Sequence, residues 1–73
     1  MKVRTQNMMQ CVEFGNCHIV ADGFGVRLCI ESPNSRNVAV AGNYGSEEIA
    51  KGVLQEMIYA FARGEPVFYM PAE

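Results

Sequence analysis

The segment at residues 42–64 is the longest periodic stretch of the chain, and it predicts an α-helix. Its apolar residues recur at intervals of three and four, which places them on one side of a helix. Ser46 is the predicted N-cap, two glutamates follow it at the positive end of the helix, and Arg63 and Gly64 suit the C-terminal end. Gly52 interrupts the helix at a cost of about 1 kcal/mol relative to alanine. The expected apolar stripe consists of Ile49, Ala50, Val53, Leu54, Met57, Ile58 and Phe61.

The residues before this helix form short segments in which apolar and polar side chains alternate, as in half-buried β-strands. We expect strands at residues 3–6, 10–14, 17–21, 26–31 and 37–41, separated by turns at 7–8, 15–16, 22–25 and 32–35. Residues 15–16 have the composition of a two-residue hairpin turn. Strands joined by such short connections pair antiparallel. The predicted fold is therefore α+β, a single domain over residues 1–73: an antiparallel four- to five-stranded meander packed against one C-terminal helix and followed by an extended tail at 66–71.

Strand alternation assigns each residue of the expected sheet to one of two faces. The face toward the helix would contain Val12, Phe14, Ile19, Val26, Leu28, Ile30, Val38 and Val40. The opposite face would contain Cys11, Glu13, His18, Val20, Arg27, Cys29, Glu31, Ala39 and Ala41. This second face is less polar than a solvated face, so we expect a homo-oligomer, with a partly solvated face as the alternative. The aromatic tail would dock either on its own domain or on a neighbouring subunit.

Length and charge narrow the class of protein. A chain of 73 residues buries only about 60% of its unfolded surface, and self-association is a natural way to complete so small a core. The net charge of −2 argues against direct nucleic-acid binding, although a symmetric oligomer can gather single arginines into a local anion pocket. No stretch approaches the roughly 20 apolar residues of a membrane span. Three cysteines without an export signal indicate reduced thiols and a cytoplasmic location.

No pattern of catalytic or metal-binding residues stands out. Cys11, His18 and Cys29 fall on one predicted sheet face, but their irregular intervals lack the paired cysteines of zinc sites. The glycine-rich turn at residues 42–46 lacks the lysine of a phosphate-binding loop. We therefore expect a protein that is not an enzyme and that uses neither a metal nor a cofactor.

The polar segment at residues 4–7 is a candidate ligand-binding strand. Arg4 and Gln6 would project on the same side, where a guanidinium and an amide can hold a phosphate or carboxylate and the edge of a base. The alternative is a solvated edge strand.

Three segments together resemble a family of small uncharacterised proteins from bacteriophages and prophages of Gram-positive bacteria. They are the start VRTQN, the helix segment GNYGSEEIA with VL behind it, and the ending VFYMP. Family members tend to carry an IRSQD-like start, a GxYxTxExAxxVL-like helix and a VFQMP-like ending. This chain departs from that pattern at Asn7, where the family prefers aspartate, and at Tyr69, where it prefers glutamine. The resemblance implies a phage accessory protein in the cytoplasm of the infected host, and such proteins often bind a component of host defence.

The sequence thus favours a non-enzymatic, homo-oligomeric counter-defence protein that captures a small anionic, nucleotide-like signal between subunits. Arg4 and Gln6 would contact phosphate or base, Arg27 would add charge, and Tyr44, Phe68 or Tyr69 would stack on a base. Two alternatives remain open. One is an inhibitor that blocks a host protein through Glu47, Glu48, Glu56 and Glu65, and the other is an assembly protein that acts only by self-association.

Overall fold

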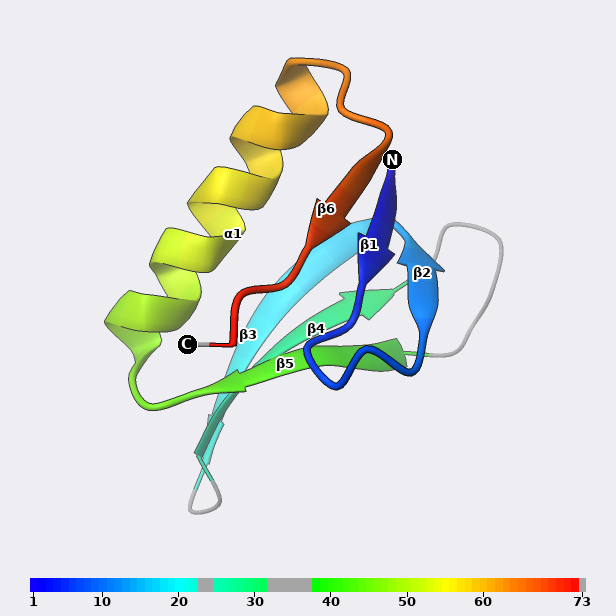
Figure 1. Cartoon of the computed structure of the whole chain (residues 1–73). Helices are drawn as coiled ribbons and strands as arrows, with labels where there is room; N and C mark the ends of the chain where they lie inside the picture. Colours follow the sequence, from blue (N-terminus) through cyan, green and yellow to red (C-terminus); the bar gives the residue numbers. More distant parts are fainter. Residues whose placement is uncertain (23–24, 32–37, 73) are drawn as a thin grey trace.

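The computed structural model describes residues 1–22, 25–31 and 38–72. Within them the chain forms an α+β fold with one C-terminal helix, as the sequence predicts (Figure 1). The predicted turn at residues 32–35 and the centre of the one at 22–25 lie outside the described residues. The elements are β1 (Lys2–Arg4), β2 (Cys11–Glu13), β3 (Asn16–Asp22), β4 (Gly25–Glu31), β5 (Val38–Tyr44), α1 (Glu47–Ala62) and β6 (Val67–Tyr69).

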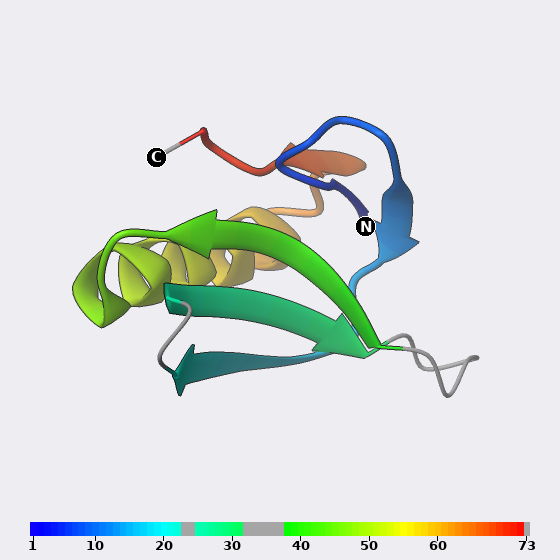
Figure 2. The ribbon, with the colours of Figure 1, turned by 90° about the horizontal axis from the view of Figure 1, so that it is seen from below.

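The strands form two sheets rather than one meander. Strands β3, β4 and β5 make the expected antiparallel meander, whereas β1 pairs with β2 on one side and with β6 on the other. Residues 15–16 are therefore not a hairpin turn, because β2 and β3 on either side of them belong to different sheets. Figure 2 shows the two sheets as separate layers that meet near β5. The prediction of a hairpin was wrong because β2 finds its partner in β1 instead.

Helix α1 begins and ends where its sequence predicts. The Ser46 hydroxyl accepts a hydrogen bond from the Ile49 N–H at 3.2 Å, and Gly64 adopts a left-handed φ of 76° after the last turn. The buried face is narrower than the predicted stripe and consists of Ala50, Val53, Met57 and Ala60. Contrary to prediction, Ile49, Ile58 and Phe61 are exposed.

A β-bulge in β5 reverses the predicted faces of that strand. Leu28 pairs with Gly42 and Cys29 pairs with Val40, so Ala41 is an extra residue between them. Ala41 and Gly42 are both buried, whereas Val40 is 45% exposed. The sequence assigned Val38 and Val40 to the core and Ala41 to the outer face. These assignments were wrong, because simple alternation does not continue across a bulge.

The C-terminal tail docks on its own domain as strand β6, parallel to β1. The Lys2 N–H donates to the Pro66 carbonyl at 2.9 Å, and the Met70 N–H donates to the Arg4 carbonyl at 3.1 Å. The tail thereby closes a single core to which both sheets and the helix contribute. Its buried members are Val3, Leu28, Ile30, Ala41, Tyr44, Ala50, Val53, Met57 and Met70.

Candidate functional site

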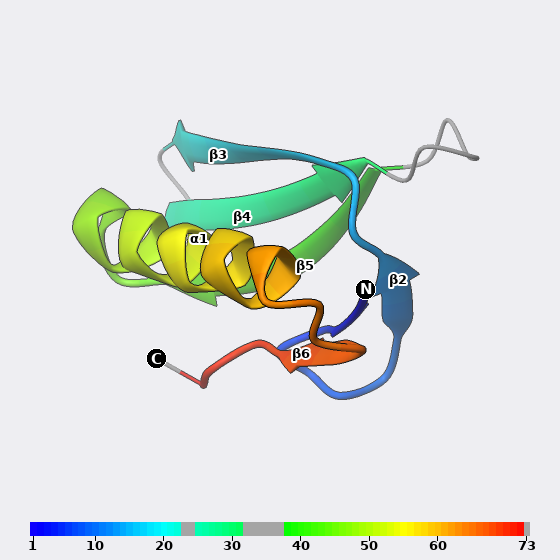
Figure 3. The same cartoon turned by 90° about the horizontal axis from the view of Figure 1, so that it is seen from above.

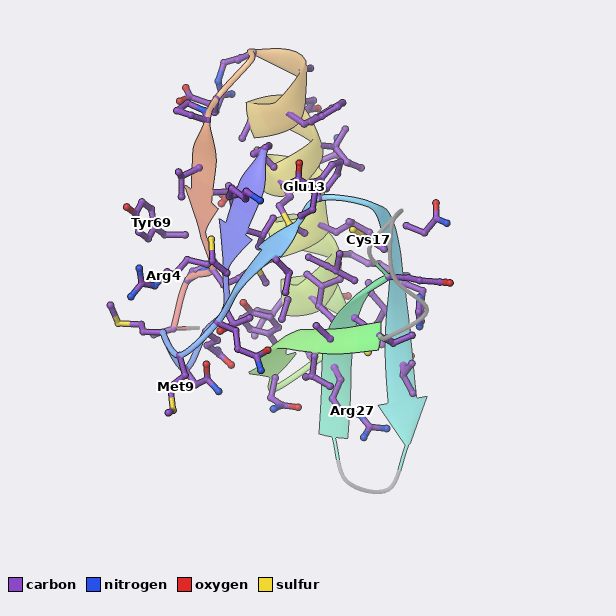
Figure 4. All side chains as sticks on the ribbon, turned by 90° about the vertical axis from the view of Figure 1, so that its right-hand side faces the viewer. Arg4, Met9, Glu13, Cys17, Arg27 and Tyr69 are labelled. Carbon is purple, nitrogen blue, oxygen red and sulfur yellow. The ribbon has the colours of Figure 1, made fainter. Side chains whose placement is uncertain are left out.

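The outer face of the β2-β1-β6 sheet brings together two of the predicted site residues. Its register places Arg4 between Cys11 on β2 and Tyr69 on β6, and the side chain of Tyr69 is 66% exposed. Figure 4 shows Arg4 and Tyr69 on the same side of the molecule, close to the turn that carries Met9. Because β1 and β6 are 65 residues apart in the chain, only the parallel pairing creates this neighbourhood.

The positive charge of this face rests on Arg4. Lys2, two residues before Arg4 on the same face of β1, forms an ion pair with Glu13 at 3.0 Å. The hydrogen bond between them raises the pKa of Lys2 and lowers that of Glu13, so both remain charged and offset each other at neutral pH. Within residues 1–22, 25–31 and 38–72, no carboxylate forms an ion pair with Arg4.

The Arg4 guanidinium is only partly used within the chain. One Nη2–H donates to the Met8 carbonyl at 3.2 Å, which ties Arg4 to the turn after β1. Its Nε is buried and has no hydrogen-bond partner in the described part of the chain. A buried donor without a partner costs about 1–3 kcal/mol, so the placement of the Arg4 side chain carries a cost in stability.

Gln6 joins the tail to β5 instead of facing a ligand. Its Nε2 donates to the carbonyls of Ala72 at 2.6 Å and Pro71 at 3.3 Å, and its Oε1 accepts from the Asn43 N–H at 2.7 Å. The Gln6 N–H also donates to the Ala41 carbonyl at 2.7 Å. The side-chain amide that the sequence assigned to a ligand therefore makes three hydrogen bonds within the chain, and it positions the segment that follows Tyr69.

Replacing Gln6 by alanine should loosen the tail without unfolding the domain. Three partly exposed hydrogen bonds are lost, and we expect a destabilisation of about 1–2 kcal/mol. Amide hydrogen exchange should show the Met70 N–H losing protection while the Leu28 N–H stays protected. Gln10→Ala, which removes a nearby exposed amide, is the matched control and should leave both rates unchanged. Equal exchange at Met70 in the two variants would contradict the assigned role of Gln6.

The other polar residues of the expected ligand strand organise a turn. Strand β1 ends at Arg4, and Thr5 is 2% exposed. The Thr5 hydroxyl accepts from the Gln10 N–H at 3.2 Å and can donate to Asn7 Oδ1 at 2.7 Å, which in turn accepts from the Met9 N–H at 3.0 Å. The signal for this turn is the presence of Thr5 and Asn7 close together, since such side chains form hydrogen bonds with the backbone of turns.

Two of the predicted aromatic residues belong to the core. Tyr44 is 5% exposed, and its hydroxyl donates to the Pro71 carbonyl at 3.0 Å. Phe68 is half-buried and packs against the core cluster. Neither presents an open ring face for a base, and Tyr69 is the one of the three with an exposed side chain.

Tyr44 should make stability depend on alkaline pH. Burial raises its pKa from the ordinary value of 10.0 to about 12, so the fold favours the neutral phenol. That contribution is complete below pH 10.0 and is lost as the pH rises through about 12. Urea midpoints measured between these pH values should fall more steeply for the wild type than for Tyr44→Phe. Parallel pH profiles for the two proteins would contradict this prediction.

Arg27 lies on the other sheet. It occupies β4 between Val20 on β3 and Asn43 on β5, and Figure 4 shows it far from Arg4. A cleft of about 190 Å³ lies between the two sites, lined by Gln6, Asn7, Val40, Ala41, Gly42 and Asn43. Its volume is below the roughly 300 Å³ at which small-molecule pockets begin, and of the predicted site residues only Gln6 lines it, so this cleft does not unite them.

The cysteines and the histidine are also separated. Cys11 lies on the β2-β1-β6 sheet, while His18 and Cys29 are cross-strand partners in the β3-β4-β5 sheet. The expectation that all three share one face was wrong, because β2 leaves the meander. None of the cysteines forms a disulfide, and burial raises the pKa of the Cys17 thiol. Among the described residues, no group of three His, Cys, Asp or Glu side chains is placed to hold a metal ion.

In the described part of the chain, no helix has both the length and the apolar character needed to cross a bilayer.

Comparisons of the chain with protein-family models, with curated proteins and with solved structures found no match.

Proposed function

We propose that this protein is a non-enzymatic, homo-oligomeric binding protein that captures a small anionic, nucleotide-like ligand at Arg4 and Tyr69. The resemblance of its sequence to phage and prophage proteins adds a biological setting to the proposal. In that setting the protein acts in the cytoplasm of the host cell and removes a signal of host defence.

One observation carries the proposal: a guanidinium without a carboxylate partner in the described structure lies beside an exposed aromatic ring. Arginine binds phosphate through paired N–H donors, and an aromatic ring next to it can stack on a base. The fold fixes the spacing of these two groups, because Arg4 and Tyr69 are register partners in adjacent strands. A nucleotide combines the phosphate and the planar base that such a pair recognises.

Native mass spectrometry of the protein purified from bacterial cells tests this proposal directly. The wild type should retain a non-covalent mass equal to that of a nucleotide, and Arg4→Gln should lose it. Lys51→Gln is the matched control, because it removes the same charge from the exposed surface of α1. Tyr69→Ala should weaken retention without affecting the fold, since the ring is exposed.

A wild-type protein that carries no small molecule, and that shows no heat of binding with added mononucleotides or cyclic dinucleotides, would overturn the proposal. Equal retention by Arg4→Gln and Lys51→Gln would overturn the assignment of the site while leaving ligand capture in place.

The exposed carboxylates of α1 favour a second candidate function, inhibition of a host protein. Glu47, Glu48 and Glu56 all lie in the solvent-exposed part of the helix, and Glu65 follows it. An acidic surface of this kind can block a basic surface on a partner. Charge reversal at Glu48 and Glu56 separates the two functions, because it should abolish inhibition of a protein partner and spare capture of a small ligand.

A further inference from the structure

Strand β3 is a long edge strand that lacks the usual protection against pairing. It spans Asn16–Asp22, and within residues 1–22, 25–31 and 38–72 it pairs with β4 alone, so no described strand uses the main-chain N–H and C=O groups of its other side. Edge strands are normally protected by proline, by charged side chains or by being very short. The strand contains no proline, lysine or arginine, and its one carboxylate residue, Asp22, is its last residue.

The other described sheet edges are short or partly covered. Strands β2 and β6 have three residues each, and β6 lies between Pro66 and Pro71. The outer edge of β5 is partly covered, because the Gln6 N–H donates to the Ala41 carbonyl. The long edge of β3 is therefore the exception.

An apolar stripe on α1 borders the same edge. The ring of Phe61 packs against that of Phe14, just before β3, with 4.9 Å between centroids. Ile58 lies three residues before Phe61, and Leu54 lies four residues before Ile58, so the three share one side of the helix, since residues three or four apart are neighbours. Ile58 and Phe61 are 46% and 52% exposed. Figure 3 shows β3 at one margin of the fold and β6 at the opposite margin.

We propose that two copies of this chain pair antiparallel through β3, so that their two three-stranded sheets become one continuous sheet and their helix stripes meet beside the junction. A two-fold axis places the β3 strands of the two copies antiparallel, so the N–H and C=O groups of one strand meet those of the other. The same axis brings the apolar helix stripe of one copy to face the stripe of the second copy. Seven residues provide an edge of about 23 Å. A standard interface takes about 800 Å² from each partner, which is about one sixth of the 4801 Å² surface of this chain.

This interface depends on the homo-oligomeric part of the proposed function and not on ligand capture. Arg4 and Tyr69 lie in the other sheet, at the margin away from β3, so pairing leaves both sites open. The dimer therefore carries one independent ligand site on each chain instead of a site shared between subunits.

Sedimentation equilibrium with a matched pair of helix variants tests the interface. Ile58 and Tyr59 are adjacent and similarly exposed, at 46% and 55%, but about 100° apart around the helix. Ile58→Glu should raise the dimer dissociation constant at least about tenfold, because it places one carboxylate from each copy in the apolar contact. Tyr59→Glu should leave the constant unchanged. Amide exchange should show β3 losing protection in Ile58→Glu while β4 keeps it.

A monomeric wild type throughout the micromolar range, with unprotected outer amides of β3, would overturn the proposal. So would a dimer that Val40→Glu dissociates and Ile58→Glu does not, because the open face of the β3-β4-β5 sheet would then be the interface. Arg4→Gln should remain dimeric. A dimer that never binds ligand would overturn ligand capture and leave this interface in place, whereas a monomer that binds ligand would overturn the interface and leave ligand capture in place.

Discussion

Leu28→Ala is expected to lower the free energy of unfolding by about 3–4 kcal/mol, the largest effect of a single truncation in this core. Leu28 is fully buried in the central strand of the β3-β4-β5 sheet, beneath α1. Removing its branched end loses the transfer free energy of those atoms and leaves a cavity. A domain of this size has a total stability of about 5 kcal/mol, so the variant should be close to unfolded at 37 °C.

Urea titration monitored by circular dichroism measures this effect, and Val40→Ala is its control. Both residues are aliphatic and lie in neighbouring strands, and simple alternation assigned both to the core. Because the bulge turns Val40 outward to 45% exposure, its truncation should cost less than about 1 kcal/mol. Similar losses for the two variants would mean that β5 does not have the described register.

Gly42→Ala is expected to destabilise the protein by about 2–3 kcal/mol although it adds a single methyl group. A Cβ at Gly42 would lie 2.8 Å from the Tyr44 hydroxyl and 2.9 Å from its Cε2. The ring cannot move away freely, because it is buried in the core and its hydroxyl is bonded to the Pro71 carbonyl. Overpacking of this kind typically costs 1–3 kcal/mol, and the displaced hydroxyl would lose its acceptor as well.

The same substitution at Gly52 should have the opposite sign. Gly52 lies within α1, and nothing lies within 4 Å of a Cβ built there. Alanine there should stabilise the helix by about 1 kcal/mol. Thermal denaturation of the two variants checks both signs. In a Tyr44→Phe background the cost of Gly42→Ala should shrink, because the shortest contact is gone, and an unchanged cost would contradict the proposed clash.

The structure departs from the sequence prediction more in the candidate site than in the fold. The pairing of Arg4 with an exposed aromatic residue remains, since Tyr69 is its register partner. Gln6, Tyr44 and Phe68 instead stabilise the tail and the core. Their polar or aromatic character suggested ligand contacts, but the same groups are equally suited to hydrogen bonds and packing within the chain, and residue type alone does not distinguish the two uses.

The sequence by itself determined the helix and most strand positions. The N-cap at Ser46, the left-handed Gly64 and the inward alternation of Leu28 and Ile30 depend on residues a few positions apart, so local physical chemistry decides them. Even the α+β class follows, because one long amphipathic helix after several short strands has few ways to bury its apolar face.

The tertiary structure decided which strands pair, where the bulge falls and what Gln6 does. Gln6 meets Ala72 across 66 residues, and β1 meets β6 across a similar separation. Several distant segments could pair with the same unpaired backbone N–H and C=O groups. Which segment does so depends on the packing of the whole core. No periodicity within one segment records that competition, which is why the sequence predicted the residues that cap the helix but not the hydrogen bonds by which Gln6 holds the tail.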